Sequence, residues 1–175
     1  MEETTLPLLR PLVTGEAAPT RPVVLDKTAQ SLLATWAAKT VLTHEPTRPT
    51  RVIPDGEFWT FCEHRKPVGN QFVFFSAYAG RRWAARSWRE PLHRAGHDGR
   101  LSRHPIGYTA TLLAGHALFR IVRCEPAGTP MWIDHSVSVT SVRLWPPTAT
   151  PQPWPPSLTV NDDAVDAFGA SSGTA

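Results

Sequence analysis

The most regular alternation of apolar and polar positions lies between residues 26 and 45. Apolar side chains recur there at i, i+3, i+4 and i+7, the spacing of one helix face. Asp26 precedes the stretch as an N-cap, and Pro46 stops it. The pattern predicts a helix with Trp36 in the core. The face is made by Ala29, Leu32, Leu33, Trp36, Ala37, Thr40 and Val41.

Four later stretches have the composition of strands. Residues 70–79 are rich in Phe and Val and have a glycine at each flank. The apolar runs 107–114 and 117–124 are separated only by Gly115–His116, a pair suited to a two-residue hairpin turn. A further strand is predicted at 137–144, where the valine spacing breaks alternation between 139 and 142 and indicates a bulge.

Prolines and glycines define two other segments. A second helix is predicted to begin at Pro54, because proline is favoured in the first turn, and to end before Pro67. Residues 80–106 are interrupted by Gly80, Gly96, Gly99 and Pro105, and are predicted to form an exposed excursion with one helical turn near 83–90.

These elements predict an α+β fold, a small antiparallel sheet of three to five strands with two or three helices on one face. The 175 residues suit one domain, over 1–145, followed by a Pro-rich extended segment, 146–168, that packs on the body. Its Trp154, like Trp145 before it, is expected to cover apolar surface. Residues 169–175 are too polar and small to bury anything, so a disordered tail is expected.

The composition excludes several classes of protein. Hydrophobic residues are 41% and charged residues 19%, which is neither a disordered nor a membrane composition. No apolar run approaches the roughly 20 residues of a membrane span, and the acidic MEETT start is wrong for a signal peptide, so a cytoplasmic protein without membrane contact is expected. Cys62 and Cys124 stand alone, so the chain itself supports neither a disulfide framework nor a four-thiolate zinc site.

The net charge of +3 conceals a strong segregation of charge. Residues 1–64 carry 6 basic and 8 acidic side chains, residues 65–123 carry 11 and 2, and residues 124–175 carry 1 and 5. Of the 18 cations, 15 are arginines, whose planar guanidinium binds phosphate with two parallel hydrogen bonds. The middle third is therefore the candidate surface for an anionic partner.

Two tryptophans lie among the arginines of this middle third, as nucleic-acid binding through phosphates and stacked bases requires. The candidate nucleic-acid-binding residues are Arg81, Arg82, Trp83, Arg86, Trp88, Arg89, Arg94, Arg100 and Arg103. The alternative is a solvated segment whose arginines pair with the acidic ends of the same chain. An acidic protein partner is the other kind of ligand that this charge would attract.

Candidate reaction centres are weak. His93 and His97 have the i, i+4 spacing of two metal ligands, but glycines at 96 and 99 oppose a helix there and no third ligand follows at a useful spacing. The pairs His44–Glu45 and Cys62-x-His64 are each too short to define a site. Phosphate-loop and dinucleotide motifs are lacking from the sequence. We therefore assign no catalytic residue, no metal ligand and no cofactor.

Several stretches, in their order, resemble the C-terminal part of actinobacterial and phage HNH-endonuclease-like proteins. They are EETTLPLLRPLVTG at the start, LATWAAKT (33–40), the Ile53–Pro54 pair, EHRKP (63–67), GYTATLLAGHALFRIV (107–122) and the WPP triplets at 145–147 and 154–156. The resemblance covers residues 1 to about 168.

The departure from that family is informative as well. Family members carry, before the equivalent of Met1, a Cys/His-rich unit that supplies the nuclease chemistry, and no residue of this sequence corresponds to it. The resemblance thus implies a non-catalytic nucleic-acid-contacting or scaffolding domain. The alternatives are a protein-interaction module for a separately encoded partner, or a nuclease whose catalytic half is encoded upstream of a misassigned start. An inactive remnant is a further reading.

Overall fold

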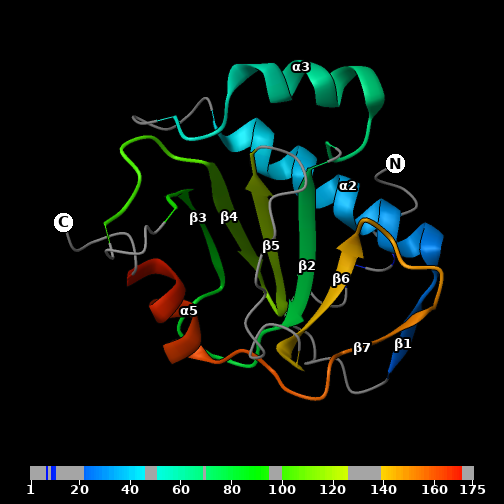
Figure 1. The fold of residues 1–175 in the computed structure, drawn as a ribbon. Coiled ribbons are helices and arrows are strands. Elements are labelled where there is room, and N and C mark those ends of the chain that lie inside the picture. The colour runs from blue at the N-terminus through cyan, green and yellow to red at the C-terminus, as the bar shows by residue number, and fades with distance from the viewer. Residues whose placement is uncertain are drawn as a thin grey trace.

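The computed structural model describes residues 7, 9–10, 22–45, 51–68, 70–94, 100–125 and 139–170, whose α+β fold is shown in Figure 1. In chain order the elements are β1 (Val23–Leu25), α2 (Lys27–His44), α3 (Asp55–His64), β2 (Gln71–Ala77), β3 (Ala85–Leu92), β4 (Gly107–Ala114), β5 (Ala117–Cys124), β6 (Ser141–Trp145), β7 (Gln152–Trp154) and α5 (Asp162–Ala170).

The larger sheet has five antiparallel strands in the order β3-β4-β5-β2-β6, so β3 and β6 are its two edges. The predicted hairpin is confirmed as β4 and β5, and Gly115 turns between them at a φ of 55°, which glycine adopts without steric cost. The bulge predicted between residues 139 and 142 was misplaced, because β6 begins only at Ser141. The irregularity in this strand lies at Leu144, where Val73 pairs with Trp145 and Phe74 with Arg143.

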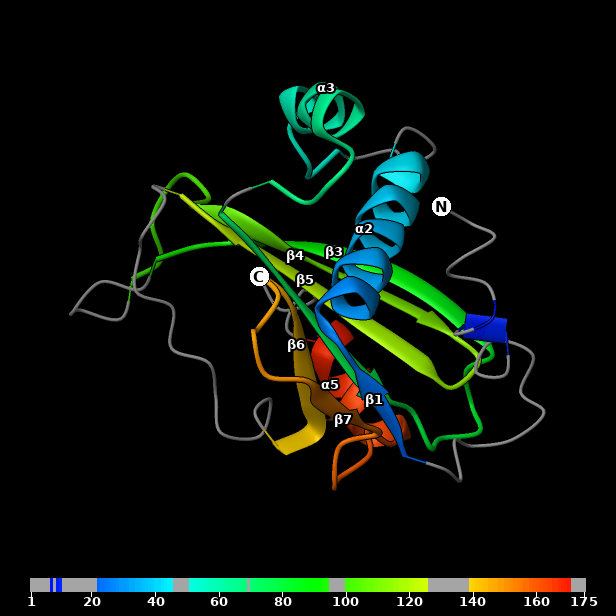
Figure 2. The same ribbon diagram turned by 90° about the vertical axis from the view of Figure 1, so that its right-hand side faces the viewer.

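Helix α2 covers one face of this sheet, which Figure 2 shows from the side. Its predicted start is confirmed, since the Asp26 carboxylate accepts a hydrogen bond of 2.7 Å from the Ala29 N–H. Leu33, Ala37 and Val41 are buried against Phe75 and Phe119 and their neighbours. Trp36 packs on this core as well, 5.5 Å from the ring of Phe119, but it is only half-buried.

Helix α5 packs against the opposite face of the sheet. Val165 is fully buried there in a second, smaller apolar cluster, with Tyr78, Leu113, Leu118 and Val160. Burying a valine side chain contributes about 1.5 to 3 kcal/mol, so this residue anchors the helix. A helix was not expected in the segment 146–168, which was predicted to be extended.

The proline-rich segment before α5 packs on the body by way of a second, two-stranded sheet. Strand β7 pairs with β1, opposing Val23 to Trp154. The Trp154 ring is buried and stacks on Phe75, with centroids 4.7 Å apart and an angle of 5° between the ring planes. This tryptophan therefore covers apolar surface as expected.

Helix α3 lies beside α2 over the ends of the strands, and the two helices run in roughly opposite directions (Figure 1). Its predicted start is confirmed, with Pro54 as N-cap and Asp55 and Glu57 in the first turn. The fold class predicted from the sequence is thus confirmed. Residues 80–106 differ from the prediction, because the helical turn expected near 83–90 is instead strand β3.

Candidate functional site

Strand β3 divides the arginine-rich segment between the two faces of the sheet. It pairs with β4 along its whole length, from Ala85 opposite Ala114 to Leu92 opposite Gly107. Successive side chains of a strand point to opposite faces, so Arg89 faces α2 while Arg86 and Trp88 face α5. The predicted excursion with a helical turn was wrong for this half of the segment, because the chain forms a paired strand there. Most of its residues are half-buried, and Arg89 is buried.

Arg89 is a buried structural residue. Its Nε lies 2.8 Å from Glu45 Oε2, and the two side chains are only 1% and 8% exposed. Its guanidinium also donates to the Val41 carbonyl oxygen. The other Glu45 oxygen accepts from the backbone N–H groups of Val52 and Ile53. This pair therefore joins β3 to the end of α2 and to the segment before α3, and Arg89 is not available to a ligand.

Asp166 of α5 engages three candidate residues at the start of β3. Its carboxylate pairs with Arg82 and with Arg86, the latter at 3.3 Å, and accepts from the Trp83 indole N–H at 3.2 Å. The Arg86 guanidinium lies over the Trp83 ring at 4.2 Å and over the Trp88 ring at 5.0 Å. The acidic C-terminal part of the chain thus neutralises part of the basic segment, which was the alternative considered from sequence.

A second α5 carboxylate fixes the turn before β3. Asp162 accepts from the backbone N–H groups of Arg81 and Arg82 at 3.1 and 3.0 Å, and from the Tyr78 hydroxyl. The hydrogen bond from Tyr78 is the main reason that the pKa of Asp162 lies below its ordinary value. The Arg81 side chain is exposed and has no acidic partner among the described residues.

The other half of the segment lies between β3 and β4, and we call its described residues, 93–94 and 100–106, the arm. The β-ladder continues into it, because the Ser102 N–H donates to the Arg94 carbonyl at 2.8 Å and the Ile106 N–H to the Leu92 carbonyl at 2.7 Å. His93 Nδ1 lies 2.8 Å from the Ser102 carbonyl oxygen. His97, the second residue of the weak His93–His97 candidate, lies outside the described residues.

The arm holds the exposed arginines of the segment. Arg94, Arg100 and Arg103 are all exposed, as is His104. Neither Arg94 nor Arg103 has an acidic partner in the part of the chain that the structure describes. The nine candidate residues therefore separate into two groups. Arg82, Trp83, Arg86, Trp88 and Arg89 make contacts within the fold, although Arg82 is also exposed, and Arg81, Arg94, Arg100 and Arg103 are exposed. Of these four, Arg81, Arg94 and Arg103 have no acidic partner among the described residues.

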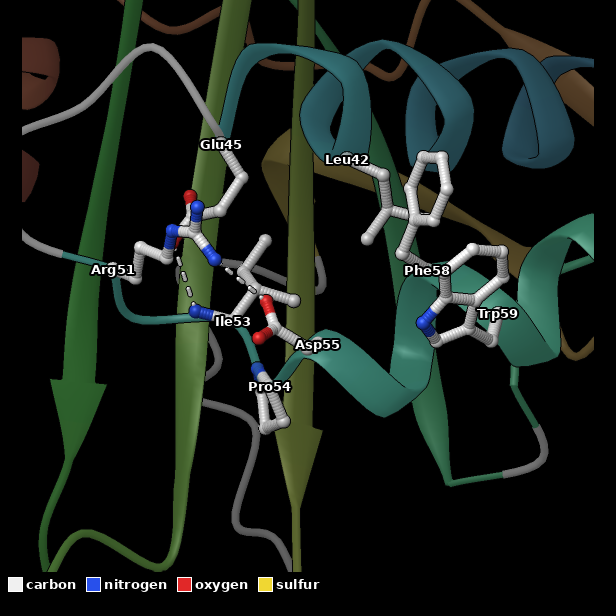
Figure 3. Close-up of a pocket in the computed structure, with 8 residues that line it drawn as sticks. All are labelled: Leu42, Glu45, Arg51, Ile53, Pro54, Asp55, Phe58 and Trp59. Atoms are coloured by element: carbon white, nitrogen blue, oxygen red, sulfur yellow. Dashed lines mark hydrogen bonds and ion pairs between the residues drawn. The ribbon is translucent and has the colours of Figure 1, made fainter.

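A pocket of about 260 Å³ lies where the end of α2 meets the start of α3, as Figure 3 shows. Leu42 and Phe58 lie together on one side of it, and the ion pair between Arg51 and Asp55, at 3.0 Å, lies on the other. The neighbouring Trp59 is 69% exposed. The pocket is mainly apolar, and its one buried carboxylate, Glu45, is already engaged by Arg89.

A buried polar network that the sequence did not reveal holds α3 on the sheet. Glu57 is 4% exposed, and its Oε2 accepts from the Gln71 amide at 2.8 Å and from the Tyr108 hydroxyl. Arg123 pairs with its other oxygen at 2.5 Å. Burial raises the pKa of Glu57, against the opposing effects of Tyr108 and Arg123, and raises the pKa of Tyr108 as well. Glu57 and its three partners bind one another within the fold, so the network is structural.

Metal chemistry has no visible basis in the residues described, where no three His, Cys, Asp or Glu side chains gather as ligands for one ion. Cys62 and Cys124, both described, are not joined in a disulfide, and burial raises the pKa of the Cys124 thiol. None of the described helices is long and apolar enough to cross a bilayer.

Comparison of the chain with protein-family models, with curated proteins and with solved structures finds no match. The resemblance to HNH-endonuclease-like proteins therefore stays a prediction from the sequence.

Proposed function

We propose that this domain contacts nucleic acid without cleaving it, and that the arm makes the contact. The observation that carries the proposal is the exposure of Arg94, Arg100 and Arg103 on one short ribbon, while Arg82, Arg86 and Arg89 are engaged by carboxylates of the fold. The binding surface that we propose is therefore the second half of the arginine-rich segment. Arg81, which is also exposed, lies before the start of β3, away from the arm.

Physical chemistry favours a phosphate backbone as the ligand of such a ribbon. Guanidinium groups bind phosphate oxygens with two parallel hydrogen bonds, and each phosphate that is neutralised releases counterions. The ribbon is joined to a sheet edge by the β3–β4 ladder, so the base of the arm is held in place. The Arg86 guanidinium lies over the rings of both Trp83 and Trp88. We therefore expect stacking of these two rings on bases to contribute little to binding.

The experiment measures duplex DNA binding by fluorescence anisotropy as the salt concentration is varied. Three backbone contacts predict a slope of about −3 for log affinity against log salt. The triple variant R94Q/R100Q/R103Q should lose this dependence. The matched control is R143Q, which removes an exposed arginine at the opposite edge of the sheet and should leave the slope unchanged.

Two outcomes would contradict the proposal. One is a parent protein without salt-sensitive binding to either duplex or single-stranded nucleic acid at micromolar concentration and low salt. The other is a triple variant that keeps the parent slope. In either case the arm would be better explained as a docking site for an acidic protein, whose binding does not require the release of counterions from a polyphosphate.

A further inference from the structure

A second basic surface lies at the other end of α2, in a groove between the first half of that helix and the residues that follow α3. The groove encloses about 530 Å³. We call it the α2–α3 groove. Its lining residues are Lys27, Thr28, Ser31, Leu32, Thr35, His64, Arg65, Lys66 and Trp145.

The α2–α3 groove is lined by three cationic side chains and a histidine, and its lining includes no carboxylate. Lys27, Arg65 and Lys66 are exposed, and none of them has an acidic partner in the described part of the chain. Only His64 has an acidic neighbour, Glu63, at 3.9 Å. Three cations that converge on one concave surface without a counter-charge favour an anionic ligand.

The backbone fixes two of these cations in place. Arg65 ends α3 in the left-handed conformation, with a φ of 54°, and its N–H donates to the Phe61 carbonyl at 2.8 Å. A non-glycine residue is uncommon in this conformation, whereas glycine adopts it readily. Replacing Arg65 by glycine would therefore remove the guanidinium and keep the backbone turn. This turn sends Arg65 and Lys66 to the groove, opposite Lys27 on α2.

Most of the remaining lining is apolar or already hydrogen-bonded. The hydroxyls of Ser31 and Thr35 donate to carbonyls of their own helix, at 2.9 and 2.7 Å, so the cations and the exposed Thr28 hydroxyl are left as donors for a ligand. Trp145 and Leu32 supply apolar wall. The buried Trp145 indole N–H has no hydrogen-bond partner within the described residues.

We propose that the α2–α3 groove binds a phosphate-bearing aromatic ligand of nucleotide size, with Lys27, Arg65 and Lys66 on the phosphate and the ring beside Trp145. The volume falls within the range of small-molecule sites, and arginine and lysine with a neighbouring indole are the groups that bind a phosphate and stack on a base. The arm lies beyond the contact of Arg89 with the end of α2, so the groove is a site distinct from it.

Isothermal titration calorimetry of the full chain with pyrophosphate and with AMP tests this site. The double variant R65G/K66Q should weaken both ligands at least about tenfold, a loss of one or two charged contacts. R65G retains a residue suited to the left-handed backbone, so a melting temperature close to the parent's separates lost binding from lost folding. The arm variant R94Q/R100Q/R103Q is the matched control and should bind both ligands as the parent does.

A second comparison tests the aromatic wall and the source of the phosphate. Trp145→Leu should weaken AMP several-fold and leave pyrophosphate unchanged, because only the ring contact is removed. In the arm variant R94Q/R100Q/R103Q, tighter binding of a 5′-phosphorylated oligothymidylate than of AMP would identify a nucleic-acid end as the ligand, and the reverse order a free nucleotide. The proposal is overturned if neither AMP nor pyrophosphate binds at millimolar concentration and low salt, or if R65G/K66Q binds both as the parent does. Either result would overturn the groove proposal alone, because duplex binding by the arm is measured separately.

Discussion

The two halves of the arginine-rich segment have the same composition and different environments. In β3 and the turn before it, Arg82 and Arg86 pair with Asp166 of α5, and Arg89 pairs with Glu45 at the end of α2. In the arm, Arg94 and Arg103 are exposed and meet no described carboxylate. Charge density in a sequence therefore locates a basic segment, whereas the packing around it decides which cations remain for a ligand.

The largest expected loss of unfolding free energy comes from replacing Arg89, the buried arginine of β3. Arg89→Ala leaves the Glu45 carboxylate buried without its partner, and breaking such a pair costs about 3 to 5 kcal/mol of unfolding free energy. Chemical denaturation measures the loss. Arg94→Ala is the control from the arm and should stay within about 0.5 kcal/mol of the parent. Equal effects of the two variants would break the distinction between the halves.

A smaller effect is expected at the α5 contact. Asp166→Ala removes the carboxylate that engages Arg82, Arg86 and Trp83, and because these groups are partly exposed the unfolding free energy should fall by only about 1 kcal/mol. The freed arginines should steepen the salt slope of duplex binding by up to about 2. An unchanged slope would contradict this prediction, because it would show that Arg82 and Arg86 do not reach the DNA even after Asp166 is removed.

The smallest expected effect is on the pH dependence of the melting temperature, through Asp162 at the start of α5. The folded state holds the pKa of Asp162 below its ordinary 3.8, so its ionised form is favoured by folding. This contribution is present above the ordinary pKa and is lost as pH falls through the lower, folded value. The melting temperature of the parent should therefore drop more steeply below about pH 4 than that of Asp162→Asn. Parallel curves for the two proteins would contradict the role of Asp162.

The sequence predicted the elements that carry their own local information. Helix α2 has an N-cap and a continuous apolar face, α3 begins at a proline, and β4 and β5 flank a glycine turn. Each of these features acts within a few residues of the chain, so periodicity and capping were sufficient to identify it.

Strand β3 and helix α5 could not be predicted, because their stability comes from distant residues. The strand has few apolar side chains, and its burial pattern is set by pairing with β4 and by Glu45, far back in the sequence. Helix α5 is short, with Val165 as its fully buried side chain, and its aspartates are explained only by Arg82 and Arg86. The choice among the nine candidate residues likewise depended on these tertiary contacts.

The most direct test of the account compares the salt dependence of duplex binding between two variants of the one segment. R94Q/R100Q/R103Q removes the arm cations, and R82Q/R86Q removes those engaged by Asp166. The account predicts that the first variant loses the slope of about −3 with an unchanged melting temperature, while the second keeps the slope and melts slightly lower. A slope that survives the arm variant and disappears with R82Q/R86Q would contradict it.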